Sequence, residues 1–196
     1  KYASKFTRGK LPIHESIGYA DYSLKRFFES VSRANWFDST LFVVTADHTA
    51  ETEYPEFSTR SNMYAIPLLF YRHQSNLKGI SNDAAQQTDI MPTVLDYLNY
   101  NKGFIAFGES VFDTSAFHFA MNYADETYQM ISHGYAVIFS ESSVLSVFDL
   151  TKDPAMKINI VHSLKNLTPV FENKIKAIIQ SYNHRLLTNN LVSERK

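Results

Sequence analysis

An aspartate and a histidine stand side by side at the end of an apolar run. Asp47 and His48 directly follow residues 40–46, whose sequence is Thr-Leu-Phe-Val-Val-Thr-Ala. In α/β proteins the loops beyond the carboxyl ends of strands gather ligand-binding groups. A carboxylate oxygen and a neutral imidazole nitrogen together suit a borderline divalent cation such as Mn²⁺ or Zn²⁺. The structural alternative is that Asp47 caps a turn and His48 is a partly buried polar side chain.

Further polar side chains could contribute to a site near this pair. Arg60 and His73 are candidates for contact with an anionic substrate, since a guanidinium can hold phosphate or sulfate oxygens bidentately. Thr49, Glu51 and Glu53 could line the same cleft, although acidic side chains in polar loops are most often solvated. The remaining histidines show no ligand spacing, and we expect structural or surface roles for them: His14, His118, His133, His162 and His184.

The elements that must position these residues alternate between helix and strand. Apolar residues spaced by three and four predict a helix over 12–34. The unbroken apolar run at 40–46 predicts a strand buried on both faces, as in a helix-covered parallel sheet. Residues 65–71 predict a second buried strand. A short helix is expected over 89–98, with Asp89 as its N-cap.

The second half of the chain has the pattern of an antiparallel meander. Short apolar segments are separated by polar or Gly-containing turns, and a last helix is expected to begin with Thr168 as its cap. The predicted fold class is α/β, with a partial α/β/α sheet layer over 1–112. A small antiparallel sheet and a terminal helix would follow over 113–196. The predicted strands of the meander are 117–123, 127–131, 134–140 and 143–150.

The composition of the chain argues against several classes of protein. The 196 residues include 19 Lys and Arg against 20 Asp and Glu, giving a net charge of −1. This balance argues against a nucleic-acid or anionic-membrane partner, because both need clustered positive charge. Apolar residues make up 44% and charged residues 20%, which predicts a packed core. The absence of cysteine excludes disulfides, thiolate ligands and a Cys nucleophile, and no apolar run is long enough for a membrane segment.

Four segments of the chain, in consistent order, carry a family resemblance. They are residues 43–48, 64–70, 87–95 followed by Phe107-Gly108, and 148–159. Together they resemble the alkaline-phosphatase superfamily, which includes sulfatases, phosphoglycerol transferases and cofactor-independent phosphoglycerate mutases. The helix that precedes the Asp-His strand is most similar to the sulfatases of the lipoteichoic-acid-synthase type.

The resemblance implies an enzyme in which Asp47 and His48 bind a divalent metal ion. Mn²⁺ is favoured, with Zn²⁺, Mg²⁺ and Ca²⁺ as alternatives. The substrate would be a sulfate or phosphate ester, attacked by a nucleophile to form a covalent intermediate. In the family this nucleophile is Thr or Ser in phosphotransferases and formylglycine in sulfatases. It lies upstream of the Asp-His strand, as does an acidic metal ligand, in sequence that would precede Lys1.

We therefore expect the C-terminal portion of a sulfatase- or phosphoglycerol-transferase-like enzyme, inactive alone and partnered by its missing N-terminal half. The family implies an extracytoplasmic location, periplasmic or at the cell-surface face of the inner membrane, with a membrane-anchored parent. An autonomous, non-catalytic binding module is the alternative, because fold similarity does not establish chemistry. A cytoplasmic mutase-like enzyme shares the Thr-Ala-Asp-His string but is disfavoured by the downstream Pro-Thr and Asp-Pro segments.

Overall fold

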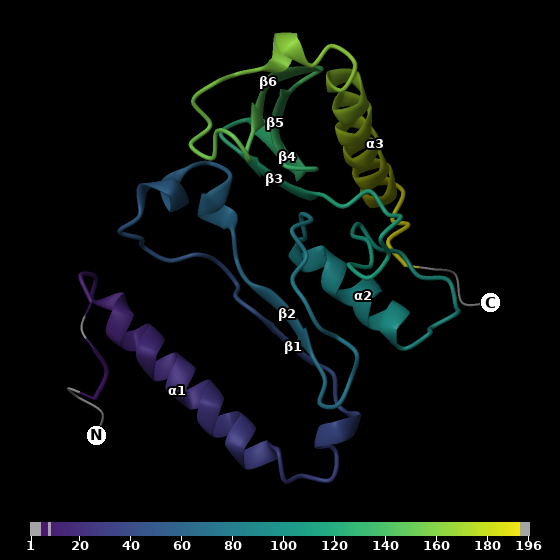
Figure 1. Cartoon of the computed structure of the whole chain (residues 1–196). Coiled ribbons are helices and arrows are strands. Elements are labelled where there is room, and N and C mark those ends of the chain that lie inside the picture. The colour runs from purple at the N-terminus through teal and green to yellow at the C-terminus, as the bar shows by residue number, and fades with distance from the viewer. Residues whose placement is uncertain (1–4, 8, 193–196) are drawn as a thin grey trace. The chain divides into compact units, whose positions relative to one another are not determined.

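The chain folds into two compact units, Lys1–Ile80 and Ser81–Lys196. The computed structural model describes residues 5–7 and 9–192, and Figure 1 shows its helices and strands. The α/β fold class is confirmed. The boundary predicted after residue 112, between the partial α/β/α layer and the small antiparallel sheet, stays a prediction. In the described part of the chain, no helix combines the length and the apolar character needed to cross a membrane.

The first unit holds one long helix and two strands. Helix α1 (Ile13–Val31) confirms the helix expected over 12–34. Strands β1 (Phe42–Thr45) and β2 (Leu68–Tyr71) confirm the two expected strands and pair with each other in antiparallel register. Three short 3₁₀ helices complete the unit: η1 (Phe37–Ser39), η2 (Pro55–Ser58) and η3 (Asn62–Tyr64).

The expected parallel, doubly covered sheet is wrong for these two strands. They run antiparallel, and β1 is only half-buried, with Thr45 exposed at its end. The expectation that the second strand is buried is also wrong, because alternate residues of β2 are exposed, including Leu69 at 54%. The apolar run has another cause, which is aromatic packing. The ring of Phe42 lies 5.1 Å from that of Phe28 in α1 and 5.5 Å from that of Phe37. A continuous apolar run therefore reflects contact with α1 here and not burial between two helical layers.

The second unit is built around a four-stranded meander. The strands pair in the order β3-β4-β5-β6, all antiparallel, as expected. The last helix begins at Thr168, but Leu167 holds the N-cap position, so the expected capping by Thr168 is wrong. The elements are η4 (Gln87–Asp89), α2 (Ile90–Tyr97), β3 (Ala120–Ala124), β4 (Thr127–Ser132), β5 (Tyr135–Ser140), β6 (Ser143–Asp149), η5 (Val161–Ser163) and α3 (Thr168–Leu187).

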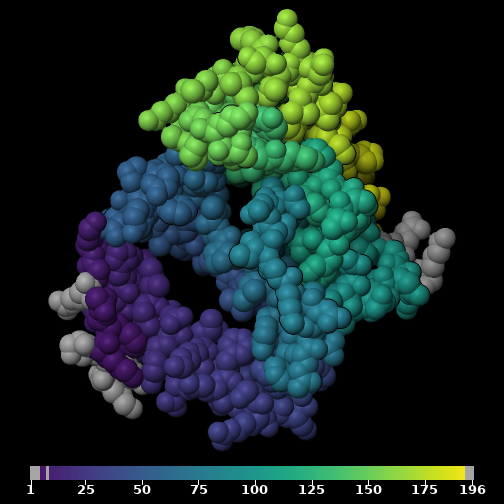
Figure 2. All heavy atoms as spheres, in the orientation of Figure 1, coloured from purple at the N-terminus to yellow at the C-terminus, as the bar shows by residue number. Residues whose placement is uncertain are grey.

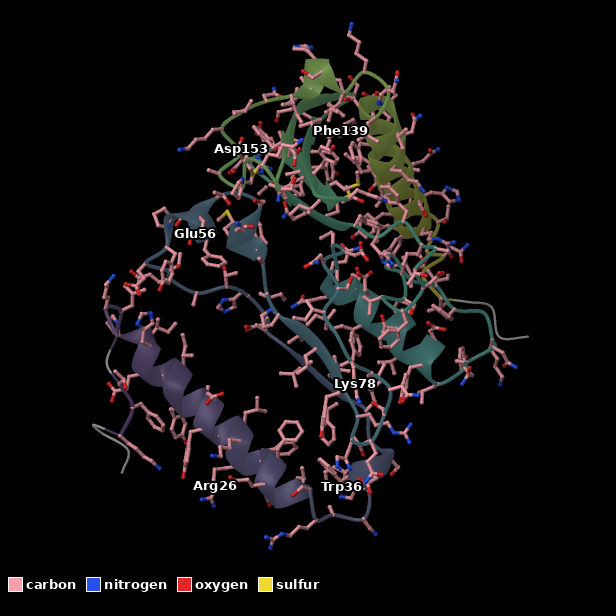
Figure 3. The ribbon with its side chains drawn as sticks, in the orientation of Figure 1. Arg26, Trp36, Glu56, Lys78, Phe139 and Asp153 are labelled. Atoms are coloured by element: carbon pink, nitrogen blue, oxygen red, sulfur yellow. The ribbon has the colours of Figure 1, made fainter. Side chains whose placement is uncertain are left out.

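The core of the second unit lies between the meander and α3. Figure 1 shows α3 lying along the sheet, and Figure 3 shows Phe139 on the side of the sheet that faces it. Phe171 and Ile175 of α3 are fully buried against this face, with 1% and 0% exposure. Burying large apolar side chains in this way is the main stabilising contribution to such a unit.

Asp89 is a buried carboxylate that ties two loops together. Its Oδ2 accepts the backbone N–H of Gln86 at 2.8 Å, and its Oδ1 accepts that of Glu109 at 2.9 Å. Asp89 holds the N-cap position of α2, as expected, but its side chain makes no cap bond to that helix, because these two bonds occupy it. Burial raises the pKa of Asp89, and the two N–H donors act in the opposite direction. A Cβ on Gly108 would lie 2.3 Å from Asp89 Oδ1, so the loop approaches this closely only because glycine stands there.

The segment that follows β6 protects the edge of that strand. Asn159 Oδ1 accepts the N–H of Val147 at 3.1 Å, and the N–H of Ile160 donates to the Val147 carbonyl at 2.8 Å. Asp153, labelled in Figure 3, accepts the N–H of Ile158 through Oδ2 at 2.6 Å. These bonds satisfy backbone groups that an edge strand would otherwise expose. The segment 148–159 therefore has a structural role.

Candidate metal centre

Asp47 and His48 lie in the loop that directly follows β1, as expected from the sequence. Their side chains are 88% and 79% exposed. Asp47 Oδ1 accepts the N–H of His48 at 2.9 Å, while Asp47 Oδ2 lies 3.6 Å from His48 Nε2. The structural alternative, which required a partly buried His48, is wrong in this respect. The carboxylate and the imidazole turn toward each other at the surface of the first unit.

The imidazole of His48 has a defined hydrogen-bonding state. Its Nδ1 lies 2.6 Å from the backbone carbonyl oxygen of Thr49. A carbonyl oxygen only accepts hydrogen bonds, so Nδ1 must carry the hydrogen. In the neutral ring, Nε2 then keeps its lone pair. Histidines that bind metals typically donate the other ring N–H in this way, to a carboxylate or a backbone carbonyl.

The pair fits part of a divalent-cation site. Oxygen and nitrogen ligands bind such ions at about 2.0–2.2 Å, so donor atoms up to about 4 Å apart can share one ion. Asp47 Oδ2 and His48 Nε2 meet this condition at 3.6 Å. A complete site needs further ligands. Residues 5–7 and 9–192 contain no cluster of three or more His, Cys, Asp or Glu side chains that could hold a metal ion.

The loop that carries the pair is attached to η3. Thr49 Oγ1 donates to the backbone carbonyl of Met63 at 2.5 Å. The turn between η2 and η3 is itself braced, because Asn62 Nδ2 donates to the Glu56 carbonyl at 2.9 Å. The sequence singled out Thr49 as a residue that could line a cleft, but a bond to a residue fourteen positions away has no signal in local spacing.

The acidic residues beyond the pair do not join it as ligands. Glu53 is mostly buried, and its Oε2 lies 2.9 Å from Lys10 Nζ. Glu51 is exposed in the same loop.

The antiparallel register separates His73 from the pair. Thr45 at the end of β1 lies opposite Leu68, and His73 follows the far end of β2. At about 3.4 Å per residue, the four-residue ladder places them about 10 Å or more apart. His73 Nδ1 instead lies 2.7 Å from Asp38 Oδ1, and its ring packs against Phe37. The structure does not bring this candidate together with Asp47 and His48.

Arg60 lies three residues before Met63, whose carbonyl accepts the bond from Thr49. It occupies the turn between η2 and η3 and is half-buried. That turn belongs to the segment that Thr49 binds through the Met63 carbonyl. Its contact with an anionic substrate stays a prediction.

Comparison with known proteins finds a family match over part of the chain and likenesses to two solved structures. Residues 13–100 match the sulfatase family. The chain resembles the crystal structure of a protein in the alkaline phosphatase superfamily from Vibrio parahaemolyticus, with a TM-score of 0.71 and 20% identity over 99% of this chain and 47% of that one. It also resembles a Bacteroides thetaiotaomicron protein from a locus for glycosaminoglycan metabolism, with a TM-score of 0.61 and 15% identity over 91% and 46%. No curated protein matches.

These likenesses concern the fold. The chain spans about half the length of each of the two solved structures. The resemblance to the alkaline-phosphatase superfamily expected from the sequence is confirmed, whereas the lipoteichoic-acid-synthase subtype stays a prediction.

Proposed function

We propose that this chain, whose residues 13–100 form part of a sulfatase-family domain, supplies Asp47 and His48 to the divalent-cation site of a longer enzyme that acts on sulfate or phosphate esters. One observation carries the proposal. The two side chains stand at the end of β1 with Oδ2 and Nε2 3.6 Å apart, and the Nδ1 hydrogen of His48 is already donated to a carbonyl.

Each residue has a definite part in this chemistry. A divalent cation supplies Lewis-acid polarisation of an ester oxygen when it is bound. Asp47 contributes a negative charge and an oxygen donor, and His48 contributes a neutral nitrogen donor through Nε2. This mixed set suits Mn²⁺ and Zn²⁺, with Mg²⁺ and Ca²⁺ as oxygen-preferring alternatives. The nucleophile would come from the rest of the enzyme. Its bond to sulfur or phosphorus would form as the ester bond breaks.

The remainder of the enzyme is the proposed partner. In the first unit α1 has no buried residue, and Ile17, Leu24 and Phe27 are 54%, 42% and 45% exposed. Figure 2 shows an open gap between the spheres of α1 and those of the blue segment that holds η2 and η3. Apolar surface left open on this scale is typical of a site for another polypeptide. With about half the length of the matched structures absent here, the missing half is the occupant that we propose.

The family further supports an extracytoplasmic location, periplasmic or at the cell-surface face of the inner membrane, as part of this proposal. An autonomous binding module is the alternative proposal. Such a module should melt cooperatively as a monomer and bind little hydrophobic dye. Aggregation, self-association or strong dye binding by the 196-residue chain would instead support the incomplete-enzyme proposal.

The proposal is tested by turnover in the protein of natural length that contains this chain. Asp47→Ala and His48→Ala should each abolish Mn²⁺-dependent hydrolysis of p-nitrophenyl sulfate or p-nitrophenyl phosphate. His184→Ala is the matched control, because this residue is exposed on α3 in the second unit and should leave turnover unchanged. Turnover retained in both of the first two variants refutes the assignment.

Peptide-mapping mass spectrometry of the same protein would separate the two substrate classes. An unmodified Thr or Ser at the nucleophile position would indicate phosphoryl or phosphoglycerol transfer. Formylglycine there would indicate hydrolysis of sulfate esters. A natural chain that begins near Lys1 would refute the incomplete-enzyme proposal and favour the binding module.

A further inference from the structure

We propose that Thr49 is a positioning residue for His48: its carbonyl fixes the imidazole tautomer, and its hydroxyl holds that carbonyl in place. The inference rests on the proposed function in one respect, which is that Nε2 is the ligating nitrogen. The hydrogen bonds that support it are independent of any metal ion.

The ring of His48 depends on hydrogen bonding for its orientation. The side chain is 79% exposed, so packing against neighbours restrains it little. Its closest polar contact is the 2.6 Å bond from Nδ1 to the Thr49 carbonyl. Without this bond, the ring could turn and exchange its hydrogen between the two nitrogens.

The competing tautomer would disable the pair. If Nε2 carried the hydrogen, that hydrogen would face Asp47 Oδ2, which lies 3.6 Å from Nε2. The two candidate ligands would then form a hydrogen bond with each other. Nε2 would then have no lone pair for a cation. The bond to the Thr49 carbonyl prevents this, because it places the hydrogen on Nδ1.

The hydroxyl of Thr49 holds in place the carbonyl that accepts the Nδ1 hydrogen of His48. Thr49 Oγ1 donates to the Met63 carbonyl at 2.5 Å, which attaches the loop to η3. The side chain is half-buried, unlike those of Asp47 and His48 on its amino-terminal side. One residue therefore joins the exposed ligand pair to the braced turn beneath it.

The test uses the 196-residue chain with ¹⁵N-labelled histidine and no added metal. Imidazole ¹⁵N chemical shifts of His48 are recorded at a pH where the ring is neutral. We expect the hydrogen on Nδ1 in the wild type and in Thr49→Ser, which keeps the hydroxyl. Thr49→Val matches the size of threonine but lacks the hydroxyl, and should shift the hydrogen toward Nε2. The control is Thr45→Val, because Thr45 is exposed and its hydroxyl donates only a 3.4 Å bond to the neighbouring Ala46 carbonyl.

A Mn²⁺ titration of the same variants gives the second readout. Residues that support metal ligands change affinity by about 10–100-fold when removed. We expect Thr49→Val to bind Mn²⁺ at least about tenfold more weakly than Thr49→Ser and Thr45→Val.

The outcomes separate the two proposals. A shifted tautomer in Thr49→Val supports the positioning role even when no form binds Mn²⁺, because this chain supplies only two ligands and the metal site is refuted by the turnover test of the longer protein. Equal Mn²⁺ binding and equal tautomers in the wild type and Thr49→Val overturn the positioning role alone. Nε2 protonation in the wild type overturns it as well, without need of a variant.

Discussion

Gly108→Ala should destabilise the second unit strongly. A Cβ at this position would lie 2.3 Å from Asp89 Oδ1 and 2.5 Å from the Thr88 carbonyl oxygen. The second of these atoms is backbone and cannot rotate away. Overpacking of this kind costs about 1–3 kcal/mol, and displacing Asp89 from the Glu109 N–H removes a charge-assisted bond worth about 1.5–3 kcal/mol. We therefore expect a loss of about 2.5–6 kcal/mol in the free energy of unfolding.

Urea unfolding followed by circular dichroism measures this loss. With an m-value of about 1–3 kcal/mol per molar, the midpoint should fall by roughly 1 M or more. Gly103→Ala is the matched control, since a Cβ there would meet nothing within 4 Å. Its midpoint should stay close to that of the wild type. Equal midpoints for the two variants would refute the close-approach argument for Gly108.

Three further predictions concern stability in the second unit. Burial holds the pKa of Asp89 above its ordinary value, so its contribution to stability is greatest below the unfolded pKa and is lost as pH rises through the folded pKa. Asp89→Asn should remove this part of the pH dependence, and an unchanged profile of unfolding free energy against pH would contradict it. Asn159→Ala should cost about 1–3 kcal/mol in urea unfolding by leaving the N–H donors of Val147 and Val161 without their shared acceptor, whereas the exposed Asn101→Ala should cost little. Phe171→Ala should cost about 3–5 kcal/mol from a side chain with 1% exposure, and a similar loss for Val170→Ala, which is 46% exposed, would show that burial is not the cause.

The periodicity of apolar residues was sufficient to predict the elements but not their pairing. Helix α1 and strands β1 and β2 lie where three- and four-residue spacings and apolar runs indicated them. Whether two strands run parallel depends on which chain segments meet, and an apolar run carries no information on that. The antiparallel register is also the reason that His73 and the pair lie at opposite ends of the ladder.

Residue preference located Asp89 at the start of α2 but gave it the wrong partners. Aspartate favours the N-cap, where its side chain binds the next turn. In the structure it binds the N–H of Glu109, twenty residues away, which no local pattern indicates. Only this long-range contact explains why glycine is needed at position 108, where a Cβ would collide with Asp89.

The sequence was enough to place the two candidate ligands together, but not to predict the bonds that support them. The position of Asp47 and His48 after an apolar run was enough to place both side chains in one loop beyond β1. The bonds of Thr49 depend on how that loop meets η3, which sequence spacing does not encode. Under the proposed function, the further ligands come from the rest of the longer enzyme.

Selective paramagnetic broadening by Mn²⁺ shows directly whether Asp47 and His48 bind a divalent cation together. The histidine resonances of the ¹⁵N-labelled chain are followed during a substoichiometric titration, which detects even weak binding by two ligands. We expect His48 to broaden first and Asp47→Asn to remove this selectivity. His73 is the internal comparison, because it also lies beside an aspartate, 2.7 Å from Asp38 Oδ1, but holds that carboxylate through Nδ1. Broadening of His73 before His48, or of all histidines alike, would contradict the account.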